Sequence, residues 1–182
     1  MALPLKNSSS LHDAGAIGVT SRRVFHCGDT VAVGQFDRVL FLIPSAGVRR
    51  GPDPLVDRVR AAIAHAYPDG FGRLAIIEKG MMPINLEQQR IVAKELRSYG
   101  DQLRCTATVF EEPGFQAAMH RMAYVGIQNL LGRRGRTAAF GDISSALKWM
   151  STRLPLDSVE SAKAFIEESR AQLRLMKGET GR

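Results

Sequence analysis

The sequence predicts an α/β protein built on a mixed, mostly parallel β-sheet with packed helices. Residues 103–110 (LRCTATVF) alternate apolar residues with β-branched threonines, which is typical of a strand. A helical pattern ends before this strand at Gly100, and another begins after it at Glu111-Glu112-Pro113-Gly114. Strands that alternate with helices in this way favour parallel pairing, because each helix returns the chain to the same end of the sheet.

Five further strands are expected, over residues 22–27, 30–34, 39–43, 74–77 and 136–140. The first two form an antiparallel hairpin in this interpretation, because the turn residues Gly28-Asp29 separate them. The run VLFLI at 39–43 is continuously apolar, which is typical of a strand buried on both faces.

Five helices are expected, beginning near Pro54, Leu86, Phe115, Asp142 and Asp157. Pro54 suits the first helical position after an Asp53 N-cap, and Asn85 with Gln88 has the spacing of a capping box. The second helix is expected to turn Leu86, Ile91, Val92 and Leu96 to the core. Residues 115–131 are apolar almost throughout, so this helix is expected to be the most buried.

The chain of 182 residues, with 45% hydrophobic residues, favours one domain. We expect a disordered tail over 1–14, the α/β domain over 15–151, an amphipathic helix over 155–176 and a tail over 177–182. No apolar run approaches the roughly 20 residues of a membrane span, and the first residues lack a signal-peptide pattern. These features predict a cytoplasmic protein without membrane contact, whose Cys27 and Cys105 are buried, reduced thiols.

The formal net charge of +7 raises the question of a nucleic-acid partner. The lysine and arginine residues are spread along the whole chain. The sequence contains no recognition helix and no basic motif interleaved with aromatic residues, so a nucleic-acid partner is not expected. Arg133, Arg134 and Arg136 form the densest group. They are interpreted as solvated surface or as a patch for an anion or an acidic partner.

The order of the expected elements, together with the ending AAFGDISSALKWM at 138–150, resembles STAS-like domains related to bacterial anti-sigma-factor antagonists. The resemblance covers about residues 21–150. It implies a STAS-like fold and a non-enzymatic, regulatory protein-interaction module without a cofactor, whose partner is another protein or a second copy. In phospho-switched members a serine lies at the start of the helix after the second parallel strand. The corresponding loop here, EKGMMPINLEQQ at 78–89, has no serine or threonine, so that switch is not expected.

Two apolar segments are candidates for the partner surface. Met81 and Met82, beside Pro83, form a loop tip that either packs in the core or anchors a partner. The C-terminal helix carries an apolar stripe that the family fold does not require, and Phe165, Ile166 and Leu173 are its candidate contact residues. We expect helix and loop together to supply the interaction surface. The alternative is that the helix covers an open face of its own sheet.

A rival function places an enzyme or small-ligand site at the carboxyl ends of the strands. Glu78, Glu111, Glu112 and Asp142 would lie near this edge, where carboxylates bind Mg²⁺ or act as acid and base. Helix capping and the helix dipole are the stronger explanation for the last three, so a metal or catalytic role is not expected. The four histidines show no ligand spacing, so no metal site is expected. Trp149, the single tryptophan, is expected to be buried and to anchor the short helix against the sheet.

Overall fold

The computed structural model of this protein describes residues 22–27, 31–44, 54–132 and 136–176. Within these ranges one six-stranded sheet has its strands in the order of the sequence. The strands are β1 (Arg22–Cys27), β2 (Val31–Phe36), β3 (Val39–Pro44), β4 (Phe71–Ile77), β5 (Leu103–Phe110) and β6 (Thr137–Phe140). The first three pair antiparallel, and β3 to β6 pair parallel. The prediction of a mixed, mostly parallel sheet is therefore confirmed.

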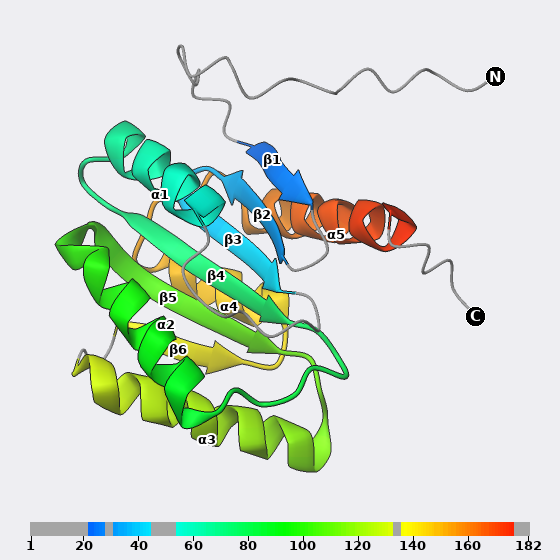
Figure 1. Ribbon diagram of the computed structural model, residues 1–182. Coiled ribbons are helices and arrows are strands. Elements are labelled where there is room, and N and C mark those ends of the chain that lie inside the picture. Colours follow the sequence, from blue (N-terminus) through cyan, green and yellow to red (C-terminus); the bar gives the residue numbers. More distant parts are fainter. Residues whose placement is uncertain (1–21, 28–30, 45–53, 133–135, 177–182) are drawn as a thin grey trace.

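Helices cover both faces of this sheet (Figure 1). They are α1 (Pro54–Ala66), α2 (Leu86–Ser98), α3 (Gly114–Leu131), α4 (Ile143–Ser151) and α5 (Val159–Met176), with a short 3₁₀ turn at Gly100–Gln102. The first three pack on one face, and α4 and α5 pack on the other. Along β3, Leu40 and Leu42 belong to the core under α1 to α3, whereas Phe41 and Ile43 belong to the opposite core. This alternation confirms that the apolar run of β3 is buried on both faces.

The predicted helix caps at two positions are confirmed. The backbone N–H of Gln88 donates to the Asn85 side chain over 2.9 Å, and the Gln88 side chain accepts from the Asn85 backbone over 2.8 Å. At α4 the backbone N–H of Ser145 donates to Asp142 over 2.8 Å. These bonds satisfy orphan donors of the first helical turn and fix where α2 and α4 begin. Asp53 lies outside the described residues.

The prediction that residues 115–131 form the most buried helix is wrong. Only Ala117, His120, Tyr124 and Ile127 of α3 are buried. Phe115, Met119, Met122 and Val125 are exposed, and so is Leu86, which was expected in the core of α2. One side of α3 contacts α2 and the sheet, and no other described element covers its opposite side. A helix that is apolar over most of its length therefore presents an apolar surface to solvent.

The C-terminal helix α5 belongs to the core. Ala162 and Ile166 are fully buried, and the ring of Phe165 packs against Phe36 and Phe41 at centroid distances of 6.4 and 5.9 Å. The prediction that Phe165 and Ile166 contact a partner is wrong, and the alternative that α5 covers its own sheet is confirmed. The physical reason is that α4 covers only β4 to β6 on this face of the sheet. The strands β1 and β2 are covered by α5. The side chain of Leu173 lies outside the described residues.

Trp149 is half-buried at the rim of the same core, which corrects the expectation of full burial. Its ring lies 5.6 Å from that of Phe140, and the Arg153 guanidinium lies 3.9 Å from the ring centroid. Ala146, Leu147 and Met150 are the side chains of α4 that are fully buried against the sheet. They supply the anchor that the sequence assigned to the tryptophan.

Two further sequence expectations concern the cysteines and the membrane. Cys105 is buried with a free thiol, and burial raises the pKa of that thiol to about 12, so it stays protonated. The side chain of Cys27 and the segments 1–14 and 177–182 lie outside the described residues. None of the described helices is long and apolar enough to cross a membrane.

Candidate functional site

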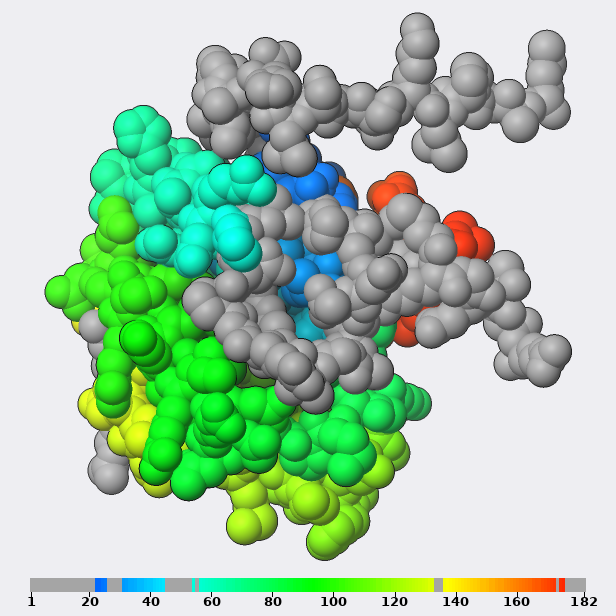
Figure 2. Space-filling view, in the orientation of Figure 1, coloured from blue at the N-terminus to red at the C-terminus, as the bar shows by residue number. Residues whose placement is uncertain are grey.

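An apolar surface lies along the outer side of α3. Phe115, Met119, Met122 and Val125 are spaced four, three and three residues apart, so they share one side of the helix. We call these four residues the α3 stripe. The exposed fraction is 79% for Phe115 and 75% for Met122. Figure 2 shows the face of the molecule on which α1, α2 and α3 lie next to one another, with α3 at the lower margin.

Met82 and Leu86, at and before the start of α2, are also exposed large apolar side chains. The neighbouring Met81 is half-buried, and its carbonyl oxygen accepts a hydrogen bond from Nε2 of His120 on α3 over 3.0 Å. The His120 ring is itself stacked on Phe110, with centroids 5.3 Å apart. These contacts tie the loop to the buried side of α3, and the next residue of the loop, Met82, is 77% exposed. Among the described residues, Leu175 on α5 is the only exposed large apolar side chain outside this region.

Most of the exposed charged side chains of α2 and α3 are basic. The exposed bases of α2 and α3 are Arg90, Lys94, Arg97 and Arg121. Glu87 is the only fully exposed acid on the two helices, both of which the structure describes completely. The layer therefore carries an excess of positive charge.

The predicted basic group after α3 is only partly described. Arg136 pairs with Asp101 over 3.3 Å, and both side chains are exposed, so this ion pair contributes little to stability. Arg133 and Arg134 lie outside the described residues. Their assignment to an anion or acidic-partner patch stays a prediction.

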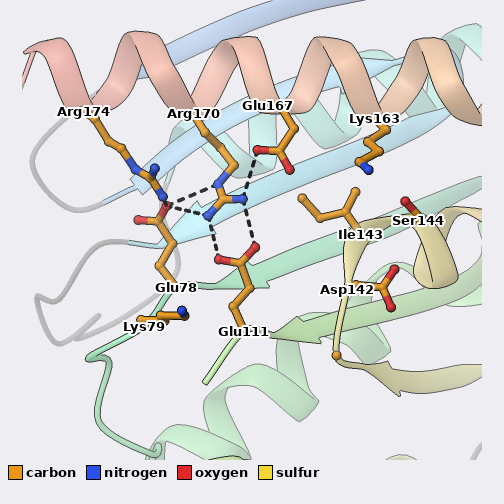
Figure 3. Close-up of a pocket in the computed structure, with 11 residues that line it drawn as sticks. Glu78, Lys79, Glu111, Asp142, Ile143, Ser144, Lys163, Glu167, Arg170 and Arg174 are labelled. Atoms are coloured by element: carbon orange, nitrogen blue, oxygen red, sulfur yellow. Dashed lines mark hydrogen bonds and ion pairs between the residues drawn. The ribbon is translucent and has the colours of Figure 1, made fainter. Parts of the chain in front are cut away.

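A polar cavity of about 630 Å³ lies at the carboxyl ends of the parallel strands (Figure 3). Its centre is Arg170 of α5, which is 6% exposed. The Nη2 atom of Arg170 lies 3.1 Å from Glu78 and 2.6 Å from Glu111, and Nη1 lies 3.2 Å from Glu167. Burial by itself lowers the pKa of Arg170, but the hydrogen bonds and charges of Glu111, Glu167 and Glu78 outweigh burial and raise it.

The acids proposed for an enzyme site are engaged in structural contacts. Glu78 and Glu111 pair with Arg170, and Glu112 accepts a hydrogen bond from the Gly80 backbone over 2.7 Å. Asp142 caps α4, and the hydrogen bonds from Ser145 lower its pKa. Among the described residues, no group of three or more His, Cys, Asp or Glu side chains is placed to hold a metal ion. The cavity thus contains an arginine clamp that ties α5 to β4 and β5.

The sequence interpretation did not identify Arg170 as part of this edge. Ala162, Ile166 and Arg170 follow one another at four-residue intervals, and all three are buried. The sequence feature that could have revealed this site is an arginine at a core position of an amphipathic helix. Its partners are glutamates that directly follow two strands.

Comparisons with known proteins give no match: no family model, no curated protein and no solved structure corresponds to this chain. The resemblance to STAS-like domains stays a prediction from residues 21–150.

Proposed function

We propose that this protein is a non-enzymatic interaction module of STAS-like type, which binds an apolar, acid-bearing segment of another protein on the α3 stripe. The observation that carries the proposal is the exposure of Phe115, Met119, Met122 and Val125 on one side of α3. Contiguous exposed apolar patches mark interaction surfaces in folded proteins. Burying such side chains stabilises a complex by about 25 cal/mol per Å² of apolar area, before the costs of association.

The charge of this layer supports a partner other than a second copy. Arg90, Lys94, Arg97 and Arg121 are exposed on α2 and α3, and the whole chain carries a net charge of +7. Two copies meeting on this surface would bring like charges together, which opposes association. A partner with acidic residues around an apolar helix or strand would instead gain attraction at the rim.

The composition of the loop before α2 supports a mode of binding that phosphorylation of this loop does not control. Residues 78–85 contain no serine or threonine, and the Asn85 side chain is engaged in the capping box of α2. Binding is therefore proposed to be independent of phosphorylation at this loop.

Site-specific photocross-linking in the cells that express the protein tests this function. A photoreactive residue at Met122 samples the α3 stripe, and the same residue at Leu175 is the matched control, because both side chains are exposed and apolar. We expect a cross-linked protein that appears with Met122 and not with Leu175, and whose contact segment is apolar and acidic. Identical products at both positions, no product at Met122, or a product that is a second copy of this chain would contradict the proposed partner.

A further inference from the structure

A second cavity, of about 390 Å³, lies between the sheet and the helices α2 and α3. Its floor is formed by β4 and β5, its walls by side chains such as Ile91 and Ala123, and one end by Met81 and Met82. Met82 is exposed, so the cavity reaches the surface at this end. A volume of this size falls within the range of about 300–1,000 Å³ that is typical of small-molecule sites. It is an order of magnitude larger than the roughly 30 Å³ that one water molecule occupies.

A buried arginine projects from the floor of this apolar cavity. Arg73 lies on β4, is 6% exposed, and has a buried Nε atom without a hydrogen-bond partner. No ion pair or side-chain hydrogen bond between described residues involves its guanidinium. Arginine does not lose its proton in proteins, so this positive charge persists inside the cavity. A buried charge without a partner is costly, which is why such groups are normally paired.

A hydroxyl group lies beside the guanidinium. Thr106 on β5 is the register partner of Arg73, and register partners of neighbouring strands project from the same side of the sheet. The Oγ1 atom of Thr106 is buried and has no hydrogen-bond partner either. Thr108 lies two positions further along the same side and also lines the cavity. Two adjacent unsatisfied groups therefore face one apolar space.

The acid that lines this cavity, Glu95, is engaged with a tyrosine of the same helix end. The Glu95 carboxylate accepts a hydrogen bond from the Tyr99 hydroxyl over 2.6 Å. The geometry of the cavity thus leaves room for an anion at the guanidinium.

We infer that this cavity binds a small molecule with an apolar body and one carboxylate group. The carboxylate accepts hydrogen bonds from the Arg73 guanidinium and the Thr106 hydroxyl, because a guanidinium matches the two oxygens of a carboxylate. The apolar body lies against Ile91, Phe110 and Ala123. This site is internal and does not depend on the partner proposed for the outer side of α3.

Isothermal titration calorimetry on the full chain tests the inference with three probes of equal chain length. They are decanoate, decanol and decylammonium, each kept below its micellar concentration. We expect the wild-type protein to bind decanoate at least about ten times more tightly than decanol, and decylammonium least, since a hydrogen bond between a guanidinium and a carboxylate is stronger than one to a neutral hydroxyl. Equal affinities for decanoate and decanol, or no binding of any probe, would overturn the inference and leave a cavity filled by water only.

Substitution of the arginine separates its charge from the shape of the cavity. Arg73→Met should abolish the preference for decanoate over decanol, whereas Arg104→Met, at an exposed position of β5, should keep it. Arg73→Met removes an unpaired buried charge, so its unfolding temperature should stay equal or rise. Ala123→Phe fills the cavity from α3 and should weaken decanoate and decanol alike. Unchanged decanoate binding in folded Arg73→Met or Ala123→Phe protein would overturn the site.

Discussion

The ring of Phe41 occupies the space that a side chain on Gly34 would need. A Cβ atom at Gly34 would lie 2.1 Å from Cζ of Phe41, and the two residues are register partners on β2 and β3. Phe41 in turn contacts Phe165 of α5 edge to face, with centroids 5.9 Å apart. The glycine therefore gives Phe41 its position beneath α5 and joins the antiparallel strands to the C-terminal helix.

Gly34→Ala should destabilise the fold by about 1–3 kcal/mol, because the Phe41 ring must move and disturb its contact with Phe165. Urea denaturation measures the difference in the free energy of unfolding. Gly141→Ala is the control, since nothing lies within 4 Å of a Cβ at Gly141. Its effect should stay within about 0.5 kcal/mol. Equal effects of the two substitutions would contradict the packing described here.

Loss of α5 should unfold the domain. Ile166→Ala should lower the free energy of unfolding by about 2–5 kcal/mol, because Ile166 is fully buried under the sheet. Leu175→Ala on the same helix is exposed and should change it little. A truncated chain ending at Met150 should be insoluble or lack fixed tertiary structure by near-ultraviolet circular dichroism. A soluble, cooperatively folded monomer of that length would show that α5 is dispensable.

The arginine clamp predicts unequal effects of two neighbouring arginines. Arg170→Met should destabilise by about 3 kcal/mol, because it leaves the Glu78 and Glu111 carboxylates partly buried together without their cation. Arg174→Met should cost less than about 1 kcal/mol, since Arg174 is 55% exposed and lies 3.4 Å from Glu78. Thermal and urea denaturation of both variants measure these costs. The opposite order would exclude the clamp as a stabilising contact.

The cap of α4 predicts a pH dependence. Hydrogen bonds from Ser145 lower the pKa of Asp142 in the folded state. Its stabilising effect is therefore complete above the unfolded pKa of about 3.9, and is lost as the pH falls through the lower folded pKa.

At pH 7 Asp142→Ala should cost about 0.5–2 kcal/mol, and this cost should shrink on acidification as the wild-type carboxylate is protonated. Asp142→Asn keeps an N-cap oxygen but has no titrating group. The difference in the free energy of unfolding between Asp142→Asn and Asp142→Ala should therefore be the same at both pH values. Urea denaturation at pH 7 and pH 3 measures both differences. A cost of Asp142→Ala that is constant over this range would contradict an ionised cap.

Local sequence signals predicted most of the fold, because strand periodicity and helix caps depend on neighbouring residues. The alternation around Thr106 and the Asn85–Gln88 spacing each specify an element without reference to the rest of the chain. What surrounds an element is not a local property. The apolar sequence of α3 predicts a helix, but it does not say that the side bearing Met122 has no described neighbour.

The candidate sites were predicted less well for the same reason. Counting helices suggested that α5 was surplus, whereas the sheet needs it because α4 covers only the parallel strands on that face. Met82 was identified as a possible anchor from its place in an apolar loop, and it is exposed. Arg73 was missed, although a lone base inside the apolar strand FGRLAII is itself a signal of a buried polar site.

The affinity of the partner cross-linked at Met122 for the purified full chain tests the proposed interaction most directly. The account predicts that Met122→Glu weakens binding at least about ten-fold, or ~1.4 kcal/mol, because a carboxylate would be buried in an apolar contact with an acidic partner. It predicts that the matched substitution Leu175→Glu on the opposite side leaves the affinity unchanged. Equal affinities of the wild-type and Met122→Glu proteins would contradict docking on the α3 stripe.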